Sequence, residues 1–326
     1  MDRRAFLETL TVGLLATPLG AGAQPTTKIY RVGVVLQGGP YYLAVDGLRA
    51  GLKELGFEER KHYTLLIRDV KGDLGGVAEA ARSLEKEKVD LIYAVGTSVV
   101  VAVQRATTTE VPIVFYGGRD PVDSGLVKSL ANPRGRVTGV DSRANDLAPK
   151  RLEILKETIP RLRRVLTFYD PSNVVAQDAV AEARQAALRV RVEFVERSVH
   201  SVDDLRARVL ALKSGEVDAL FTMGDGMVIS QAKFIAETAK ARKLPTMFPE
   251  RTAVVEGGLI SYGPSFYAAG QLGARYVHRV LLGTSPAGLP VERLDRFELV
   301  LNARTAREIG LTIPPSLLAR ADQVIE

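Results

Sequence analysis

Short apolar runs alternate with helix-like patterns along the chain from residue 29 onward. The run at 29–36 (IYRVGVVL) is rich in β-branched residues and stops at Gly38-Gly39-Pro40, which is typical of a strand buried on both faces. Leucines then recur at helical spacing as far as Gly56, which predicts a helix that ends there. In this first half we predict strands at 29–36, 63–70, 90–95 and 113–116, and helices at 44–55, 77–88 and 99–106. Strands and helices that alternate at these lengths predict a parallel sheet with helices on both faces.

The pattern starts again after a short apolar segment at 137–140. In the second half we predict strands at 164–169, 190–195, 218–223 and 245–248, and helices at 174–188, 203–212 and 228–242. Matching strings lie about 130 residues apart: DLIYAVG at 90–96 parallels DALFTMG at 218–224, and VPIVF at 111–115 parallels LPTMF at 244–248. This predicts two similar α/β lobes, although strand patterns reused within one α/β protein are an alternative reading.

The C-terminal part does not extend the second half as a further repeat. A long helix is predicted at 266–282, and a loop rich in Pro and Gly follows at 284–290. A strand at 297–301 and a short helix at 303–309 come next. Such a tail suits a chain that crosses between the lobes more than once.

The N-terminus has the three parts of an export signal. The charged start contains Arg3-Arg4, an apolar stretch spans 9–19, and Ala21-Gly22-Ala23 supplies the small residues of a cleavage site. We therefore predict a signal peptide at 1–23 that resembles a twin-arginine signal, with the general secretory route as an alternative. A buried N-terminal helix is the structural alternative. On the first reading the mature protein is periplasmic.

Composition excludes several kinds of site. The chain has no Cys, which excludes disulfides, thiol nucleophiles and Cys-ligated metals. Three scattered His argue against a His-based metal site. The net charge is +6, but positive and negative residues are interspersed, so no nucleic-acid partner is predicted. The phosphate-loop, HExxH and GxSxG motifs are absent, whereas a glycosidase-type pair of carboxylates stays open.

Candidate binding residues lie where predicted strands end, because ligands of open α/β sheets bind at the carboxyl ends of the strands. Thr97 and Ser98 open a helix there and can bind a carboxylate or a small polar group. Asp225 occupies the matching place in the second half and is expected to be exposed, where it suits an ammonium or sugar hydroxyls. Asn173 also begins a helix. For all four residues, plain helix capping is the alternative.

Three tyrosines lie at or near strand ends: Tyr116, Tyr169 and Tyr262. An aromatic ring in that position can stack on a flat ligand while its hydroxyl bonds the rim of the site, and packing in the core or between lobes is the alternative. Gln37 lies at the end of the first strand. The predicted ligand-binding set is therefore Gln37, Thr97, Ser98, Tyr116, Tyr169, Asn173, Asp225 and Tyr262. We predict no catalytic residue, no metal and no cofactor.

Ten short strings along the chain carry a family resemblance. They are RVGV at 31–34, VPIVF at 111–115, DP at 120–121, GLV at 125–127, VTGV at 137–140, KRLE at 150–153, EGGLISYG at 256–263, LPVE at 289–292, FELV at 297–300 and IPPSL at 313–317. Together they resemble the periplasmic substrate-binding proteins of ABC transporters with the type I fold, and most strongly the group that includes tryptophan- and sugar-binding proteins. The Gly118-Arg119 segment departs from the pattern, because the family carries a small residue before its Asp-Pro pair.

The resemblance implies two lobes of three αβα layers joined by a hinge of three crossover strands. Lobe 1 is expected at 28–141 plus 265–290, and lobe 2 at 142–264 plus 291–326. Segments 137–145 and 262–265 are expected among the hinge strands.

The same resemblance implies a monomeric, non-enzymatic binding protein. It closes on an amino-acid-like or sugar-like molecule and delivers that molecule to an ABC permease. Two other functions stay open: a ligand sensor for a membrane receptor kinase, and a two-lobed α/β enzyme.

Overall fold

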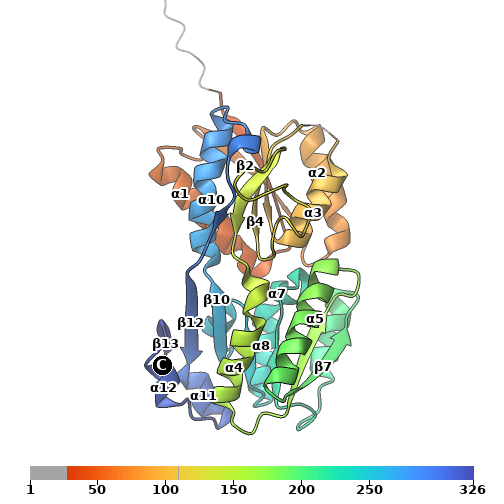
Figure 1. Cartoon of the computed structure of the whole chain (residues 1–326), viewed down its shortest axis with the longest axis vertical. Coiled ribbons are helices and arrows are strands. Elements are labelled where there is room, and N and C mark those ends of the chain that lie inside the picture. The colour runs from red at the N-terminus through yellow and green to blue at the C-terminus, as the bar shows by residue number, and fades with distance from the viewer. Residues whose placement is uncertain (1–27, 109) are drawn as a thin grey trace, which may run out of the picture.

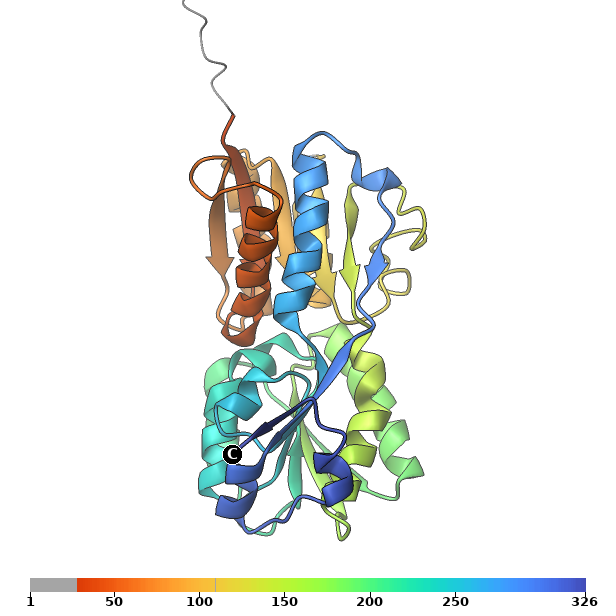
Figure 2. The same ribbon diagram turned by 90° about the vertical axis from the view of Figure 1, so that its left-hand side faces the viewer.

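Two α/β lobes make up the described part of the chain. The computed structural model describes residues 28–108 and 110–326, so the predicted signal at 1–23 lies outside the described residues. The lobes are stacked along the longest axis, and each is built on a separate sheet (Figure 1). Helices cover both faces of each sheet (Figure 2). The prediction of two similar three-layer lobes is confirmed.

The first sheet has the strand order β11-β5-β4-β3-β1-β2, and every neighbouring pair is parallel. Alternate residues of β1 enter opposite cores: Val34 packs with α1 and α10, and Val35 packs with α2 and α3. Burial on both faces explains the continuous apolar runs in the sequence. The elements are β1 Tyr30–Leu36, α1 Tyr42–Glu54, β2 Tyr63–Asp69, α2 Val77–Lys86, β3 Leu91–Val95, α3 Thr97–Ala106, β4 Ile113–Gly117, β5 Val137–Asp141, α10 Phe266–Leu281 and β11 Glu292–Arg293, with short 3₁₀ helices η1 Gly39–Tyr41, η2 Leu74–Gly76 and η4 Pro286–Gly288.

The second sheet has the order β13-β12-β10-β9-β8-β6-β7, in which only the β10–β12 pair is antiparallel. Five neighbouring strands of this sheet repeat the first sheet, since β7-β6-β8-β9-β10 corresponds to β2-β1-β3-β4-β5. The elements are η3 Ala144–Leu147, α4 Ala148–Thr158, β6 Arg164–Tyr169, α5 Val174–Arg189, β7 Glu193–Ser198, α6 Val202–Leu210, β8 Ala219–Phe221, α7 Gly226–Ser230, α8 Ala232–Ala241, β9 Thr246–Phe248, α9 Thr252–Val255, β10 Ile260–Pro264, β12 Phe297–Asn302, α11 Ala303–Ile309, α12 Pro315–Leu318 and β13 Gln323–Ile325.

Some predicted elements are displaced. The strand predicted at 190–195 is β7, which begins only at Glu193, because this edge strand is half-exposed and tolerates polar residues that the apolar pattern excluded. The helix predicted at 228–242 is two helices, α7 and α8. Helix α4 and the short strands β11 and β13 were not predicted from the pattern.

The chain passes between the lobes three times. The first passage follows β5 at Asp141, and the second follows β10 at Pro264. The third follows β11 at Arg293, a few residues beyond the expected boundary at 290/291, because Glu292 and Arg293 still pair with β5. The first and third passages run side by side, where the Leu294 amide donates to the Asp141 carbonyl oxygen at 2.8 Å.

Helix α10, which follows the second passage, packs closely against α1. An added side-chain carbon at Gly270 would overlap the backbone carbonyl oxygen of Ala44. In the same way, an added carbon at Gly47 would overlap the carbonyl oxygen of Tyr267. The two helices therefore touch backbone to backbone, and this contact fixes the start of α10 at the boundary between the lobes.

We expect Gly270→Ala to destabilise the protein by about 1–3 kcal/mol, because the methyl group forces the two helices apart. Chemical denaturation measures the change. Gly288→Ala is the matched control, since nothing lies within 4 Å of an added carbon there. Equal stability of the two variants would show that the helices do not need this approach.

Candidate functional site

A cavity lies between the lobes at the carboxyl ends of the strands. It holds about 560 Å³ of empty space, its open mouth included. Sheets of this type bind ligands at this edge. Each lobe supplies half of the lining residues. The first lobe contributes Gln37, Tyr41, Gly96, Thr97, Ser98, Tyr116, Gly118 and Phe266, and the second lobe with its entering passage contributes Ala144, Asn145, Arg151, Val175, Gly224, Gly226, Ile229 and Pro249.

Four of the eight predicted residues line this cavity: Gln37, Thr97, Ser98 and Tyr116. Gln37 is buried and reaches the opposite lobe. Its Nε2 donates to the carbonyl oxygen of Gly72 at 3.0 Å, and its Oε1 occupies the space that a side chain at Gly226 would need. Glycine at 226 thus lets the two lobes approach each other at this point.

Thr97 and Ser98 begin helix α3, whose N-cap residue Gly96 makes no side-chain capping bond. The Thr97 hydroxyl accepts from the amides of Gly118 at 3.1 Å and Arg119 at 3.3 Å, so it holds the loop after β4. The Ser98 hydroxyl instead donates across the cleft to Asn173 Oδ1 at 2.7 Å.

The other four predicted residues are absent from the lining. Asn173 caps α5 through the amide of Ala176 at 3.4 Å and also accepts the bond from Ser98, so it both caps and bridges the lobes. Tyr169 and Tyr262 are half-buried and pack against the core of the second lobe. Tyr262 lies 6.1 Å from the ring of Phe297, centroid to centroid.

Asp225 is fully buried, so the expectation of an exposed carboxylate is wrong. Its Oδ1 accepts from the amides of Met227 at 2.9 Å and Val228 at 3.2 Å, and its Oδ2 accepts from the amide of Asp170 at 3.0 Å. Burial raises the pKa of Asp225 to about 6. The neighbouring glycines, Gly224 and Gly226, face the cavity in its place.

An aromatic wall closes one side of the cavity, and we define it as Tyr41, Phe266 and Tyr116. Tyr41 stacks on Phe266 with 5.2 Å between centroids, and Tyr116 meets Phe266 edge-on at 5.6 Å. Burial raises the pKa of both tyrosines, so their hydroxyls stay protonated. Tyr41 and Phe266 were not predicted from the sequence, because Tyr41 lies in a 3₁₀ turn and Phe266 begins a long amphipathic helix.

Arg151 is the one lining residue with a charged side chain, and it was not predicted from the sequence. Its side chain is fully buried on α4. Its Nε donates to the carbonyl oxygen of Tyr262 at 2.7 Å, whereas Nη2 has no hydrogen-bond partner. Burial lowers the pKa of Arg151 to about 10, so it remains charged at neutral pH. The available signal was a positive charge on the helical stripe formed by Ala148, Leu152 and Leu155.

Neither a metal cluster nor a membrane span occurs in the described residues. Within 28–108 and 110–326, no group of three or more His, Cys, Asp or Glu is arranged to hold a metal ion. Over the same residues, no helix combines the length and apolar character that crossing a membrane requires. The cavity therefore offers hydroxyls, amides, aromatic faces and one guanidinium.

Comparison with known proteins gives relatives along almost the whole described chain. The tyrosine-binding protein of Clostridioides difficile is 26% identical over 268 residues, which are 82% of this chain and 76% of that protein. A crystal structure of a conserved domain protein from Vibrio cholerae superposes with a TM-score of 0.83 at 27% identity, over 91% of this chain and 100% of that one.

A further solved structure, an ABC domain from Streptococcus pneumonia in complex with L-Trp, has a TM-score of 0.80 at 27% identity and covers 91% of this chain and 100% of its own. These neighbours have the type I periplasmic binding fold, which confirms the predicted fold class. The profile of the family described as "ABC transporter substrate binding protein" matches residues 30–325. The chain belongs to the ABC transporter substrate-binding protein family.

Proposed function

We propose that this chain is the extracytoplasmic solute-binding component of an ABC importer. It binds a small polar or aromatic molecule in the cavity between the lobes and delivers it, as a monomer, to the permease. The observation that carries the proposal is that both lobes contribute equally to one cavity. A family relative that binds tyrosine and a structural neighbour that holds L-Trp support an amino-acid-like ligand.

Ligand binding acts through closure of the lobes. A molecule that touches both lobes makes more contacts when they are closed, so it shifts the population toward that state. Direct contacts between the lobes already favour closure: Ser98 bonds to Asn173, and Arg119 in the loop after β4 pairs with Asp178 on α5. The closed surface is then what the permease recognises.

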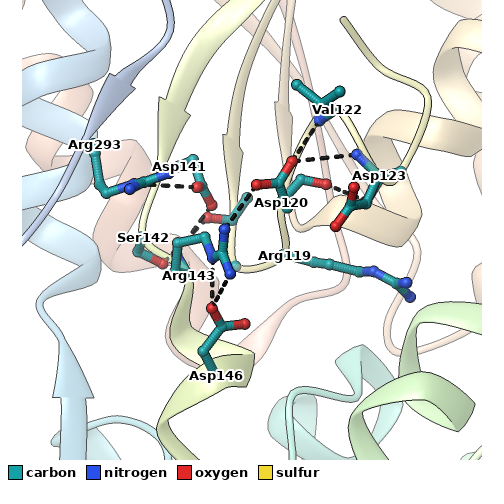
Figure 3. A network of polar contacts seen from close by, with 12 residues as sticks. Arg119, Asp120, Val122, Asp123, Asp141, Ser142, Arg143, Asp146 and Arg293 are labelled. Carbon is teal, nitrogen blue, oxygen red and sulfur yellow. Dashed lines mark hydrogen bonds and ion pairs between the residues drawn. The ribbon is translucent and has the colours of Figure 1, made fainter. Parts of the chain in front are cut away.

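A charged network lies where the first and third passages run side by side (Figure 3). Arg143, in a left-handed conformation with φ of 48°, pairs with Asp120 at 2.7 Å and with Asp146. Asp141 is buried, with its Oδ2 at 3.9 Å from Nε of Arg293. These pairs join the loop after β4 to the passages about which the lobes move.

The function is tested by ligand-induced closure. We expect at least one compound from a panel of amino acids, peptides, sugars and carboxylic acids to raise the melting temperature, because only the folded form has the cavity. The same compound is expected to reduce the radius of gyration in small-angle scattering. No shift and no compaction across the whole panel would contradict the proposed function.

The pair between the lobes gives a second prediction. Asp178→Arg places two arginines opposite each other, and we expect the unliganded protein to open and the bound ligand to be held roughly three- to tenfold more weakly. The double variant Arg119→Asp with Asp178→Arg restores the attraction and the affinity. Asp203→Arg, an exposed site on α6, is the control with the same charge change. An equal effect at both sites would show that the pair does not hold the lobes together.

Asp141 gives a pH prediction. Burial raises its pKa from the ordinary value of 3.8 to about 6, so the folded state holds its proton where the unfolded state has lost it. Stability contributed by this group is therefore present below about pH 4 and falls as the pH rises from about 4 to about 6. Relative to Asp141→Asn, the wild type should lose on the order of 2–3 kcal/mol across that window and nothing further above it. Parallel stability profiles for the two proteins would contradict this.

A further inference from the structure

The cavity carries one positive charge and no negative one. Of the residues that line it, Arg151 alone has a charged side chain. No ion pair within residues 28–108 and 110–326 involves Arg151, and its Nη2 lacks a hydrogen-bond partner. A buried charge without a counter-ion is unfavourable unless something compensates it. The described residues supply no counter-ion for Arg151, which favours a ligand that brings a negative charge.

Helix α3 strengthens the same preference. It has ten residues, its first turn lines the cavity, and its N-cap Gly96 provides no side-chain acceptor. The unpaired amides and the helix dipole therefore add positive potential on the side of the first lobe. Arg151 contributes the positive charge from the second lobe. Two independent features thus favour an anion in one cavity.

The cavity lining contains no carboxylate that could pair with the ammonium group of a ligand. The buried acids whose charges act on the Tyr41 hydroxyl are Asp225 and Glu250. Asp225 accepts three backbone amides, and Glu250 accepts the amides of Thr252 at 2.6 Å and Ala253 at 3.0 Å. Neither residue lines the cavity, so both acids serve the helices of their own lobe.

We propose that the ligand is a small aromatic monocarboxylate without an α-ammonium group, with its carboxylate bound to Arg151 and its ring against the aromatic wall of Tyr41, Phe266 and Tyr116. This inference rests on the proposed function and specifies its ligand. An α-amino acid would have to bury its ammonium against neutral oxygens, such as those of Gln37 and Asn145. The desamino acid avoids that cost and keeps the bond to the guanidinium.

Three probes of nearly equal shape separate the charges: 3-(4-hydroxyphenyl)propanoate, tyrosine and tyramine. Calorimetry with the purified full-length chain measures their affinities. We expect the propanoate to bind at least as tightly as tyrosine, and tyramine to bind on the order of 100-fold more weakly or not at all. Binding of tyramine, or tyrosine bound more tightly than the propanoate, would overturn the inference.

Variants of Arg151 test the guanidinium itself. Arg151→Gln should weaken propanoate binding on the order of 100-fold, Arg151→Lys should retain part of the affinity, and Arg189→Gln on the exposed end of α5 should change nothing. Without ligand, the melting temperature of Arg151→Gln should be unchanged or higher, because an uncompensated buried charge is gone. A lower melting temperature together with unchanged affinity would assign Arg151 a structural role and overturn the inference.

Different results would contradict the proposed solute-binding function and the proposed ligand. If a sugar or another neutral compound produces closure while the carboxylates do not bind, the inference about the ligand is wrong and the proposed function stands. If no compound of the wider panel binds, the proposed function is wrong and the inference falls with it.

Discussion

The separation of the molecule into two independently packed cores is the constraint on which the other features depend. In each lobe the sheet is buried on both faces, so neither lobe can deform without breaking close packing. The chain joins the two lobes through the three passages that follow Asp141, Pro264 and Arg293, so the proposed closure would have to bend these passages. The edges that face each other across the boundary are the carboxyl ends of strands, where helix N-termini and loops gather. The cavity lined by both lobes lies at this boundary.

Several polar side chains at this boundary already form hydrogen bonds with backbone amides of their own lobe. Asp225 and Glu250 each accept amides at the start of a helix in their own lobe, and the Thr97 hydroxyl holds the loop after β4. These groups stabilise the walls and are not free for a solute. Two features of the lining lack such partners among the described residues: the start of α3 has no side-chain cap, and Nη2 of the buried Arg151 has no hydrogen bond. The start of α3 and Arg151 therefore determine the charge of the candidate site.

Residues near the cavity differ in how far the sequence could predict their roles. Thr97 and Ser98 follow a strand and begin a helix, so the sequence predicts their position at the carboxyl end of that strand. Asp225 had the same local sequence pattern, but its carboxylate is buried. The amide of Asp170, which comes from a different element, donates to its Oδ2. Tyr262 was expected to face the solute. Its ring packs beside Phe297, while its backbone carbonyl holds Arg151.

The sequence by itself determined the periodic elements, the repeat of about 130 residues and the strand ends that carry polar residues, because these depend on neighbours along the chain. Only the tertiary structure decided which polar groups face the cavity. The bond between Arg151 and Tyr262 joins positions 111 residues apart, and the bond between Ser98 and Asn173 joins two lobes. Burial and hydrogen-bond satisfaction are properties of groups brought together by folding, so local spacing cannot distinguish a capping carboxylate from a binding one.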